Sequence, residues 1–203
     1  MSSLDLSDNI LPVFVTPVVN YLWPNSEDLN AELQAYILEC EKSEKGLSKS
    51  VVGGWHSELD MLARDAAPIA QLRERLWVFT QALLKQFSQS GETFNFRIEG
   101  WGNVLRHGQY HSMHAHPNAT WSGCYYVNGN NEVEDQPFSG RFELIDPRPA
   151  ASLNYAESSN LYGRFLLNPN PGQMIVFPSW MQHQVHPYFG DGERITVAFN
   201  VLL

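Results

Sequence analysis

The 203-residue sequence has few cysteines and no block of positive charge. Two cysteines, Cys40 and Cys124, are too few for a disulfide framework, so we expect them to remain unpaired thiols in a reducing compartment. Lys and Arg number 13 against 22 Asp and Glu, which gives a net charge of −9. Because nucleic-acid partners select clustered positive charge, we expect no nucleic-acid partner.

Long apolar runs and targeting signals are also missing. No stretch approaches the roughly 20 apolar residues that a membrane-spanning helix needs. The amino-terminal sequence MSSLDLSDN is polar and acidic, and it lacks the charged-then-apolar pattern of a secretory signal. We therefore expect a soluble, cytoplasmic protein with no membrane partner. These features do not indicate the oligomeric state, and a homodimer stays open.

The length suits one domain with a sizeable core, so we predict a single domain over residues 1–203. Residues 1–92 are predicted to be mostly helical, with apolar stripes at helical spacing over about 26–45 and 65–88. Residues 93–203 change to short strands separated by Gly- and Pro-containing turns. This order predicts a mainly β fold, a jelly roll or double-stranded β-helix, with two amino-terminal helices packed on its outer sheet.

Histidines are the most informative residues that the chain does contain. His111, His114 and His116 fall within six residues, and His183 follows near the end of the chain. Neutral imidazole is the commonest protein ligand for a mid-row metal. Because side chains alternate along a strand, we predict that His114 and His116 share one face and that His111 faces away. With the distant His183, this pair would bind one metal and leave positions open for a substrate.

Other candidates depend on weaker patterns. His186 lies three residues after His183, and strand neighbours on one face are two apart, so we do not expect both to reach one metal. Three tryptophans are candidates for lining a substrate entrance, with ordinary packing as the alternative. They are Trp101, Trp121 and Trp180.

The last predicted strand carries a candidate anion-binding residue. Arg194 shares its predicted face with Thr196, Ala198 and Asn200, and the apolar residues between them share the other face. Because the apolar face is suited to the core, Arg194 is predicted to face a polar cavity. A buried carboxylate needs a cation, and the guanidinium fork binds a carboxylate through two parallel hydrogen bonds. An exposed Arg on an edge strand is the alternative.

Four motifs, taken in chain order, resemble a known enzyme family. They are Gly108-Gln-Tyr-x-x-x-His114-x-His116, Ser122-Gly-Cys-Tyr-Tyr126-Val-Asn, Pro171-Gly172-x-x-x-x-Phe177-Pro178, and His183-Gln-Val-His-Pro187 followed by Arg194-Ile-Thr-Val-Ala-Phe-Asn200. Together they resemble the iron(II)- and 2-oxoglutarate-dependent oxygenases of the prolyl-hydroxylase-like group. The similarity is greatest to an uncharacterised bacterial and phage subgroup, and it covers roughly residues 94–203.

The resemblance implies an oxidoreductase that uses Fe(II), O₂ and 2-oxoglutarate. Its reaction would be the hydroxylation of an unactivated C–H bond in a peptide, an amino acid or a small metabolite. The implied metal ligands and catalytic residues are His114, His116 and His183. The candidate contacts of 2-oxoglutarate are Arg194, Tyr126, Asn103 and Thr196, with Arg194 at the distal carboxylate and the Tyr126 hydroxyl as a second donor to it.

The chain departs from the wider superfamily at one ligand position. That superfamily has H-x-D or H-x-E, whereas this chain has His114-x-His116, and residues 111–131 contain no Asp or Glu. Three-His iron also occurs in thiol dioxygenases, which use no 2-oxoglutarate, so a cosubstrate-free dioxygenase of cupin type stays open. A non-catalytic jelly-roll binding module is the other alternative. Convergence of Arg194 and Tyr126 near the histidines would favour 2-oxoglutarate.

Overall fold

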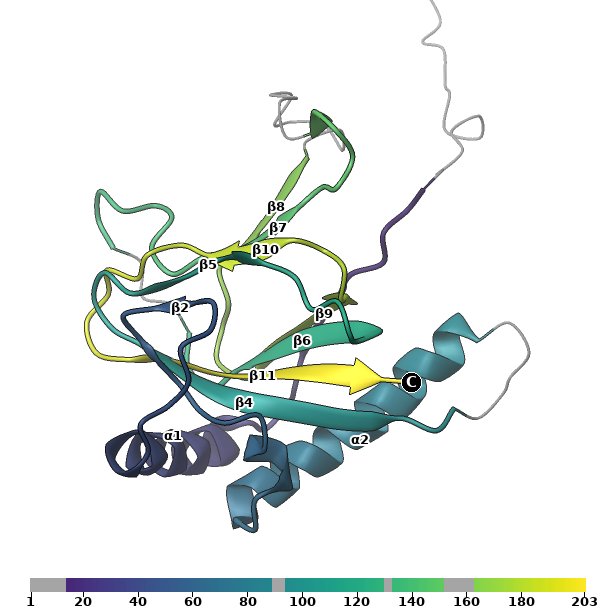
Figure 1. Ribbon diagram of the computed structural model, residues 1–203. Helices are drawn as coiled ribbons and strands as arrows, with labels where there is room; N and C mark the ends of the chain where they lie inside the picture. The colour runs from purple at the N-terminus through teal and green to yellow at the C-terminus, as the bar shows by residue number, and fades with distance from the viewer. Residues whose placement is uncertain (1–13, 89–93, 130–132, 152–162) are drawn as a thin grey trace, which may run out of the picture.

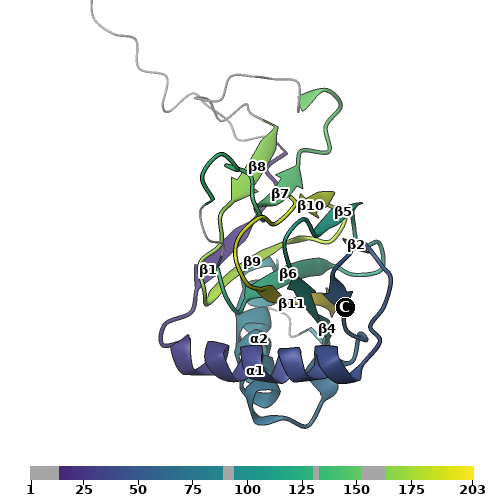
Figure 2. The same ribbon diagram turned by 90° about the vertical axis from the view of Figure 1, so that its left-hand side faces the viewer.

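The computed structural model describes residues 14–88, 94–129, 133–151 and 163–203. Two antiparallel sheets face each other, and two helices cover the outer face of the larger sheet (Figures 1 and 2). This arrangement confirms the predicted double-stranded β-helix with two amino-terminal helices. Within the described ranges, none of the helices is long and apolar enough to cross a bilayer.

The larger sheet has six strands in the order β1-β9-β6-β11-β4-β3. In chain order they are β1 (Val19–Leu22), β3 (Trp55–His56), β4 (Arg97–Leu105), β6 (Trp121–Tyr126), β9 (Gln173–Pro178) and β11 (Arg194–Leu202). Strands β4 and β11 pair along their whole lengths, with Arg194 opposite Leu105 and Leu202 opposite Arg97. This long central pair forms the floor on which the interior residues are arranged.

The smaller sheet has five strands in the order β2-β5-β10-β7-β8. They are β2 (Val51–Val52), β5 (Tyr110–His114), β7 (Phe142–Ile145), β8 (Arg164–Leu167) and β10 (His183–Val185). The pairing of β5 with β10 is irregular, because His183 lies opposite His114 but Val185 lies opposite His111. Three steps along β5 therefore match two steps along β10, which is a bulge in β5.

Two helices provide the packing on the outer face of the larger sheet. Helix α1 spans Glu27–Ser43 and helix α2 spans Ala67–Phe87, and the short 3₁₀ helix η2, Met61–Ala63, precedes α2. Both helices begin and end within about three residues of the predicted bounds. Pro68 occupies the first turn of α2, where its missing N–H costs no hydrogen bond.

The core consists of two apolar clusters, one on each face of the larger sheet. Ile195, Val197, Phe199 and Val201 of β11 pack with the helices, as the alternation in that strand predicts. The second cluster lies between the sheets. The two cysteines are free thiols, Cys40 in α1 and Cys124 in β6, so the prediction that they are unpaired is confirmed.

Candidate active site

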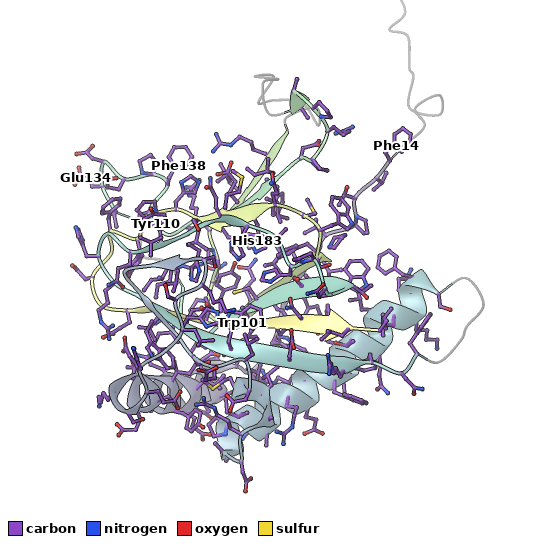
Figure 3. All side chains as sticks on the ribbon, viewed as in Figure 1. Phe14, Trp101, Tyr110, Glu134, Phe138 and His183 are labelled. Carbon is purple, nitrogen blue, oxygen red and sulfur yellow. The ribbon has the colours of Figure 1, made fainter. Side chains whose placement is uncertain are left out.

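A cavity of about 440 Å³ lies between the two sheets. Side chains of the larger sheet line its floor, and β5, β7 and β10 of the smaller sheet line the opposite side. Figure 3 shows His183 and Trp101 approaching this space from opposite sheets. The cavity is where the sequence-predicted site residues converge, because both sheets direct alternate side chains into it.

Three histidines meet in the cavity. His114, His116 and His183 each offer a ring nitrogen, and these nitrogens all lie within 4.8 Å of one another. His114 and His183 face each other across the β5–β10 pair, and His116 lies just beyond the end of β5. A backbone hydrogen bond of 2.9 Å from the His116 N–H to the Ser179 carbonyl holds this segment.

Two of the three imidazoles are oriented by the backbone two residues earlier in the chain. Nδ1 of His114 lies 2.7 Å from the Ser112 carbonyl oxygen, and Nδ1 of His183 lies 3.0 Å from the Met181 carbonyl oxygen. A carbonyl only accepts, so Nδ1 carries the proton in both rings and Nε2 keeps its lone pair. The proton position therefore leaves Nε2 of both rings available to a metal.

Burial keeps the cluster neutral. It lowers the pKa of His114 below its usual value, that of His116 to about 4 and that of His183 to about 3, and the mutual repulsion of the charged rings adds to the effect for His116 and His183. Metal coordination requires neutral imidazole. At neutral pH, protons therefore do not compete for this cluster, and its donor set suits a mid-row divalent ion such as iron(II).

The structure contradicts the prediction that His111 faces away from the pair. His111 lines the same cavity, and the Ser50 hydroxyl lies 3.3 Å from both His111 Nδ1 and His114 Nε2. The bulge in β5 is the cause, because it turns two residues that are three apart onto one face.

Arg194 lines the cavity, as the strand pattern predicts, and is 2% exposed. Its Nε donates to the Gly140 carbonyl at 3.1 Å, and its guanidinium carbon lies 5.4 Å from the centre of the Tyr126 ring. Thr196 and Asn103 lie beside it in the cavity, where the Asn103 amide donates to the Thr196 hydroxyl at 3.4 Å. The four predicted cosubstrate contacts thus converge on one end of the site.

One buried donor at this end, the Tyr126 hydroxyl, suits a bound dicarboxylate, whereas the Asn103 side-chain oxygen can only accept a hydrogen bond. Among the described residues, the Tyr126 hydroxyl and the Asn103 side-chain oxygen are buried without a hydrogen bond. Burial raises the pKa of Tyr126 well above its usual value, so the hydroxyl stays a proton donor. An unmade buried hydrogen bond costs about 1–3 kcal/mol, and a carboxylate on Arg194 would give that hydroxyl an acceptor. Tyr126 itself packs below the lining residues of the cavity.

The remaining sequence candidates divide between the site and its surroundings. His186 Nε2 donates to the Glu143 carboxylate at 2.7 Å, which agrees with the prediction that it does not join His183 at one metal. Trp101 lines the cavity, with its ring centre 5.5 Å from that of His116. Trp121 instead packs on Phe87 of α2 and belongs to the helix-side core, so the packing alternative holds for this residue. Trp180 is exposed and is not among the lining residues.

Sequence reasoning missed several lining residues. Ser50, in the loop before β2, has no motif that indicates its contact with histidines more than 60 residues away. Glu99 and Ser122 line the cavity at the end away from Arg194. The alternation of β4 and β6 could have indicated them, because each shares a face with a residue that was singled out, Glu99 with Asn103 and Ser122 with Tyr126.

A neutral three-imidazole cluster, open to a cavity with a buried guanidinium, has the donor set that a non-haem metal needs, and it lies on a double-stranded β-helix scaffold. Residues 99–200, half of the chain, match the family described as "Putative 2OG-Fe(II) oxygenase". The chain belongs to this family of 2-oxoglutarate- and iron(II)-dependent enzymes. Comparison with curated protein sequences finds no match.

Solved structures of the same fold include several such oxygenases. A Pseudomonas putida prolyl-4-hydroxylase has a TM-score of 0.65 at 15% identity, and the match covers 92% of each chain. The viral collagen prolyl hydroxylase of Paramecium bursaria Chlorella virus-1, in its 2-oxoglutarate complex, has 0.60 at 13% identity over 91% of this chain and 94% of that one. HygX of Streptomyces hygroscopicus, with nickel, 2-oxoglutarate and hygromycin B, has 0.59 at 14% identity over 92% and 82%.

Proposed function

We propose that His114, His116 and His183 bind the iron and that Arg194 binds the distal carboxylate of 2-oxoglutarate. The observation that supports this most directly is the convergence of ring nitrogens within 4.8 Å of one another in a cavity that Arg194 also lines. When bound, the iron would activate O₂ for oxidation of a C–H bond, with decarboxylation of 2-oxoglutarate to succinate. Tyr126, Thr196 and Asn103 would complete the pocket for the cosubstrate.

The protein residues contribute orientation and exclusion of water. Arg194, in a buried position over Tyr126, would fix one end of the cosubstrate and so direct its oxo-acid end toward the histidines. The Ser50 hydroxyl lies within hydrogen-bond distance of both His111 Nδ1 and His114 Nε2, so it can keep its contact with His111 when His114 is coordinated. Apolar side chains, among them Phe142 and Phe177, line the cavity beside His183 and exclude solvent.

Solved structures of this fold contain substrates of different kinds, so the substrate class that we propose is broad. One structure of this fold is a prolyl hydroxylase from Trichoplax adhaerens with a peptide fragment of hypoxia inducible factor, and HygX holds hygromycin B. For this chain we propose a small-molecule or peptide substrate. We also propose that residues 1–203 form one oxygenase domain, since both helices pack on the catalytic sheet, and that it acts in the cytoplasm, where two free thiols would persist.

Anaerobic titration with iron(II), with and without 2-oxoglutarate, tests this proposal. The expected result is a weak visible charge-transfer band that needs both additions and is lost in His183→Ala. His107→Ala is the matched control, because His107 is an exposed histidine packed against Phe189. A band that forms equally well in His183→Ala would contradict the ligand set. Iron binding with no response to 2-oxoglutarate would favour the cosubstrate-free dioxygenase.

A further inference from the structure

The floor of the cavity is a series of cross-strand rows on β4, β11 and β6. Directly opposed residues of adjacent strands share a face, and successive rows are two residues, about 7 Å, apart. In order along β11, the three rows are Asn103–Thr196–Tyr126, Trp101–Ala198–Cys124 and Glu99–Asn200–Ser122.

The first two rows already belong to the proposed site. The first holds the cosubstrate contacts next to Arg194, and the second holds Trp101, whose ring contacts that of the proposed ligand His116. The third row lies beyond the contact between Trp101 and His116, at the end of the cavity away from Arg194. Asn200 is six residues along β11 from Arg194, about 20 Å in an extended strand. A five-carbon chain with bonds of about 1.5 Å cannot span that distance, so 2-oxoglutarate leaves the third row vacant for another ligand.

The third row is a hydrogen-bonded chain that ends in a carboxylate. The Ser122 hydroxyl donates to the Asn200 oxygen at 2.8 Å, and the Asn200 amide donates to Glu99 Oε1 at 3.3 Å. Ser122 and Asn200 are buried, whereas Glu99 is half-buried at the cavity. This chain fixes the orientation of the amide and therefore the position of the Glu99 carboxylate.

The charges around the cavity make Glu99 distinctive. It is the only carboxylate among the described lining residues, and the ion pairs found among the described residues do not include it. Lys49 also lines the cavity, but it is exposed and acts on His56, which pairs with Asn103 of the first row. Asn103 is four residues along β4 from Glu99, and no ion pair joins Lys49 to this carboxylate in the described part of the chain.

An apolar wall adjoins this carboxylate. Leu59, which is 40% exposed, lines the cavity together with Trp101, and the bridge between Asp60 and Gly100 brings its segment beside Glu99. Trp101 is two residues from Glu99 on the same face of β4. A carboxylate next to an aliphatic and an aromatic surface is complementary to a cationic nitrogen on an alkyl stem.

We propose that the Glu99–Asn200–Ser122 row binds a cationic nitrogen group of the substrate, a protonated amine or a guanidinium, whose alkyl stem lies on Leu59 and Trp101. The inference rests on the proposed oxygenase function, since it takes the occupant of this row to be the substrate. It narrows the substrate class to basic amino compounds and peptides with basic side chains.

Binding of three matched probes tests the inference: pentylammonium, pentan-1-ol and pentanoate. Each is titrated by NMR into protein loaded with zinc(II) and 2-oxoglutarate. Pentylammonium should bind about fivefold more tightly than either other probe, the upper end of the ratio that one charge pair at a partly exposed site supplies. Glu99→Gln should remove this preference. Glu58→Gln, which removes an exposed carboxylate outside the cavity lining, should keep it.

The outcomes separate this inference from the proposed function. Equal binding of pentylammonium and pentan-1-ol, or a preference that survives Glu99→Gln, overturns the cation site. If the charge-transfer band with 2-oxoglutarate forms normally but pentylammonium is not preferred, only the cation site is overturned. If the preference for pentylammonium depends on Glu99 but the band does not form, only the proposed oxygenase site is overturned. If Glu99→Gln does not fold, Glu99→Lys provides the second test, because it should select pentanoate over pentylammonium.

Discussion

At the scale of the single residue, the imidazole rings of His114 and His183 are oriented in the same way. In each, Nδ1 donates to the carbonyl two residues earlier in the chain, of Ser112 and Met181 respectively. Such anchoring fixes both the ring orientation and the tautomer, and it is typical of metal-ligating histidines. The local backbone therefore supplies the preorganisation that a three-imidazole site needs.

Replacement of Arg194 by Met tests the cosubstrate contact. The variant keeps the length and the apolar stem but loses the charge and the fork, so 2-oxoglutarate should bind more weakly by about 2–5 kcal/mol. Metal affinity should stay within about twofold, because no proposed ligand changes. Calorimetric titration of metal and then of 2-oxoglutarate measures both.

Arg97→Met is the matched control for that variant. Arg97 is exposed on β4 of the same sheet, and its loss changes the net charge equally. Equal loss of 2-oxoglutarate affinity in both variants, or no loss in Arg194→Met, would show that Arg194 is structural.

A buried carboxylate outside the cavity should control stability at low pH. Burial raises the pKa of Glu143, but hydrogen bonds from Arg164, Gln184 and His186 outweigh it and lower the pKa below its usual value. A lowered folded-state pKa gives stability that is complete above the unfolded pKa, about 4.3, and is lost as pH falls through the folded value. Glu143→Gln should therefore lower the unfolding free energy by about 1.5–3 kcal/mol at pH 7, the range for hydrogen bonds to a charged group.

Urea unfolding of the parent and of Glu143→Gln between pH 3 and 7 measures this effect. The difference between the two proteins should shrink below about pH 4, where the parent carboxylate becomes protonated. A difference that stays constant over the whole range would mean that the ion pair does not stabilise the fold.

At the scale of the element, β11 illustrates what the sequence can predict. Its strict alternation places Arg194 and Asn200 in the cavity and Val197 in the helix-side core, and the structure has this arrangement. Strand β5 illustrates the reverse, because the bulge that turns His111 into the cavity depends on pairing with β10, more than 60 residues away. The burial of Trp121 on the helix side could not be predicted for a similar reason, since only the packed sheet determines which face the helices cover.

The close approach of β6 and β11 gives a prediction for these elements. A Cβ at Gly123 would lie 2.3 Å from Cζ of the Phe199 ring, which is 1% exposed. Gly123→Ala should therefore cost about 1–3 kcal/mol through overpacking, a fall of roughly 2–4 °C in Tm per kcal/mol for a chain of this size. Thermal unfolding followed by circular dichroism measures it.

A double variant shows whether that clash is the cause. Phe199→Leu removes the ring atoms that the added methyl would meet, so the losses of Gly123→Ala and Phe199→Leu should not add in the double variant. Additive losses would mean that Gly123 serves a purpose other than close packing against Phe199.

At the scale of the whole molecule, the two sheets contribute different residues to the site. The smaller sheet provides His114 and His183, and the larger sheet provides the buried cation at one end and the Glu99 carboxylate at the other. The helices stabilise the larger sheet from outside without entering the cavity. Sequence motifs predicted the fold, the histidine cluster and Arg194, and the alternation of β4 could have indicated Glu99. Ser50 required the packed sheets, because its histidine partners are distant in the chain.

A crystal structure of the protein grown anaerobically with iron(II) and 2-oxoglutarate tests the central claim most directly. The expected result is one metal with nitrogens of His114, His116 and His183 at about 2.0–2.3 Å, by analogy with other imidazole sites. Arg194 should contact the distal carboxylate of 2-oxoglutarate. Metal held by other residues, or these imidazoles more than about 6 Å apart with metal supplied, would contradict the claim.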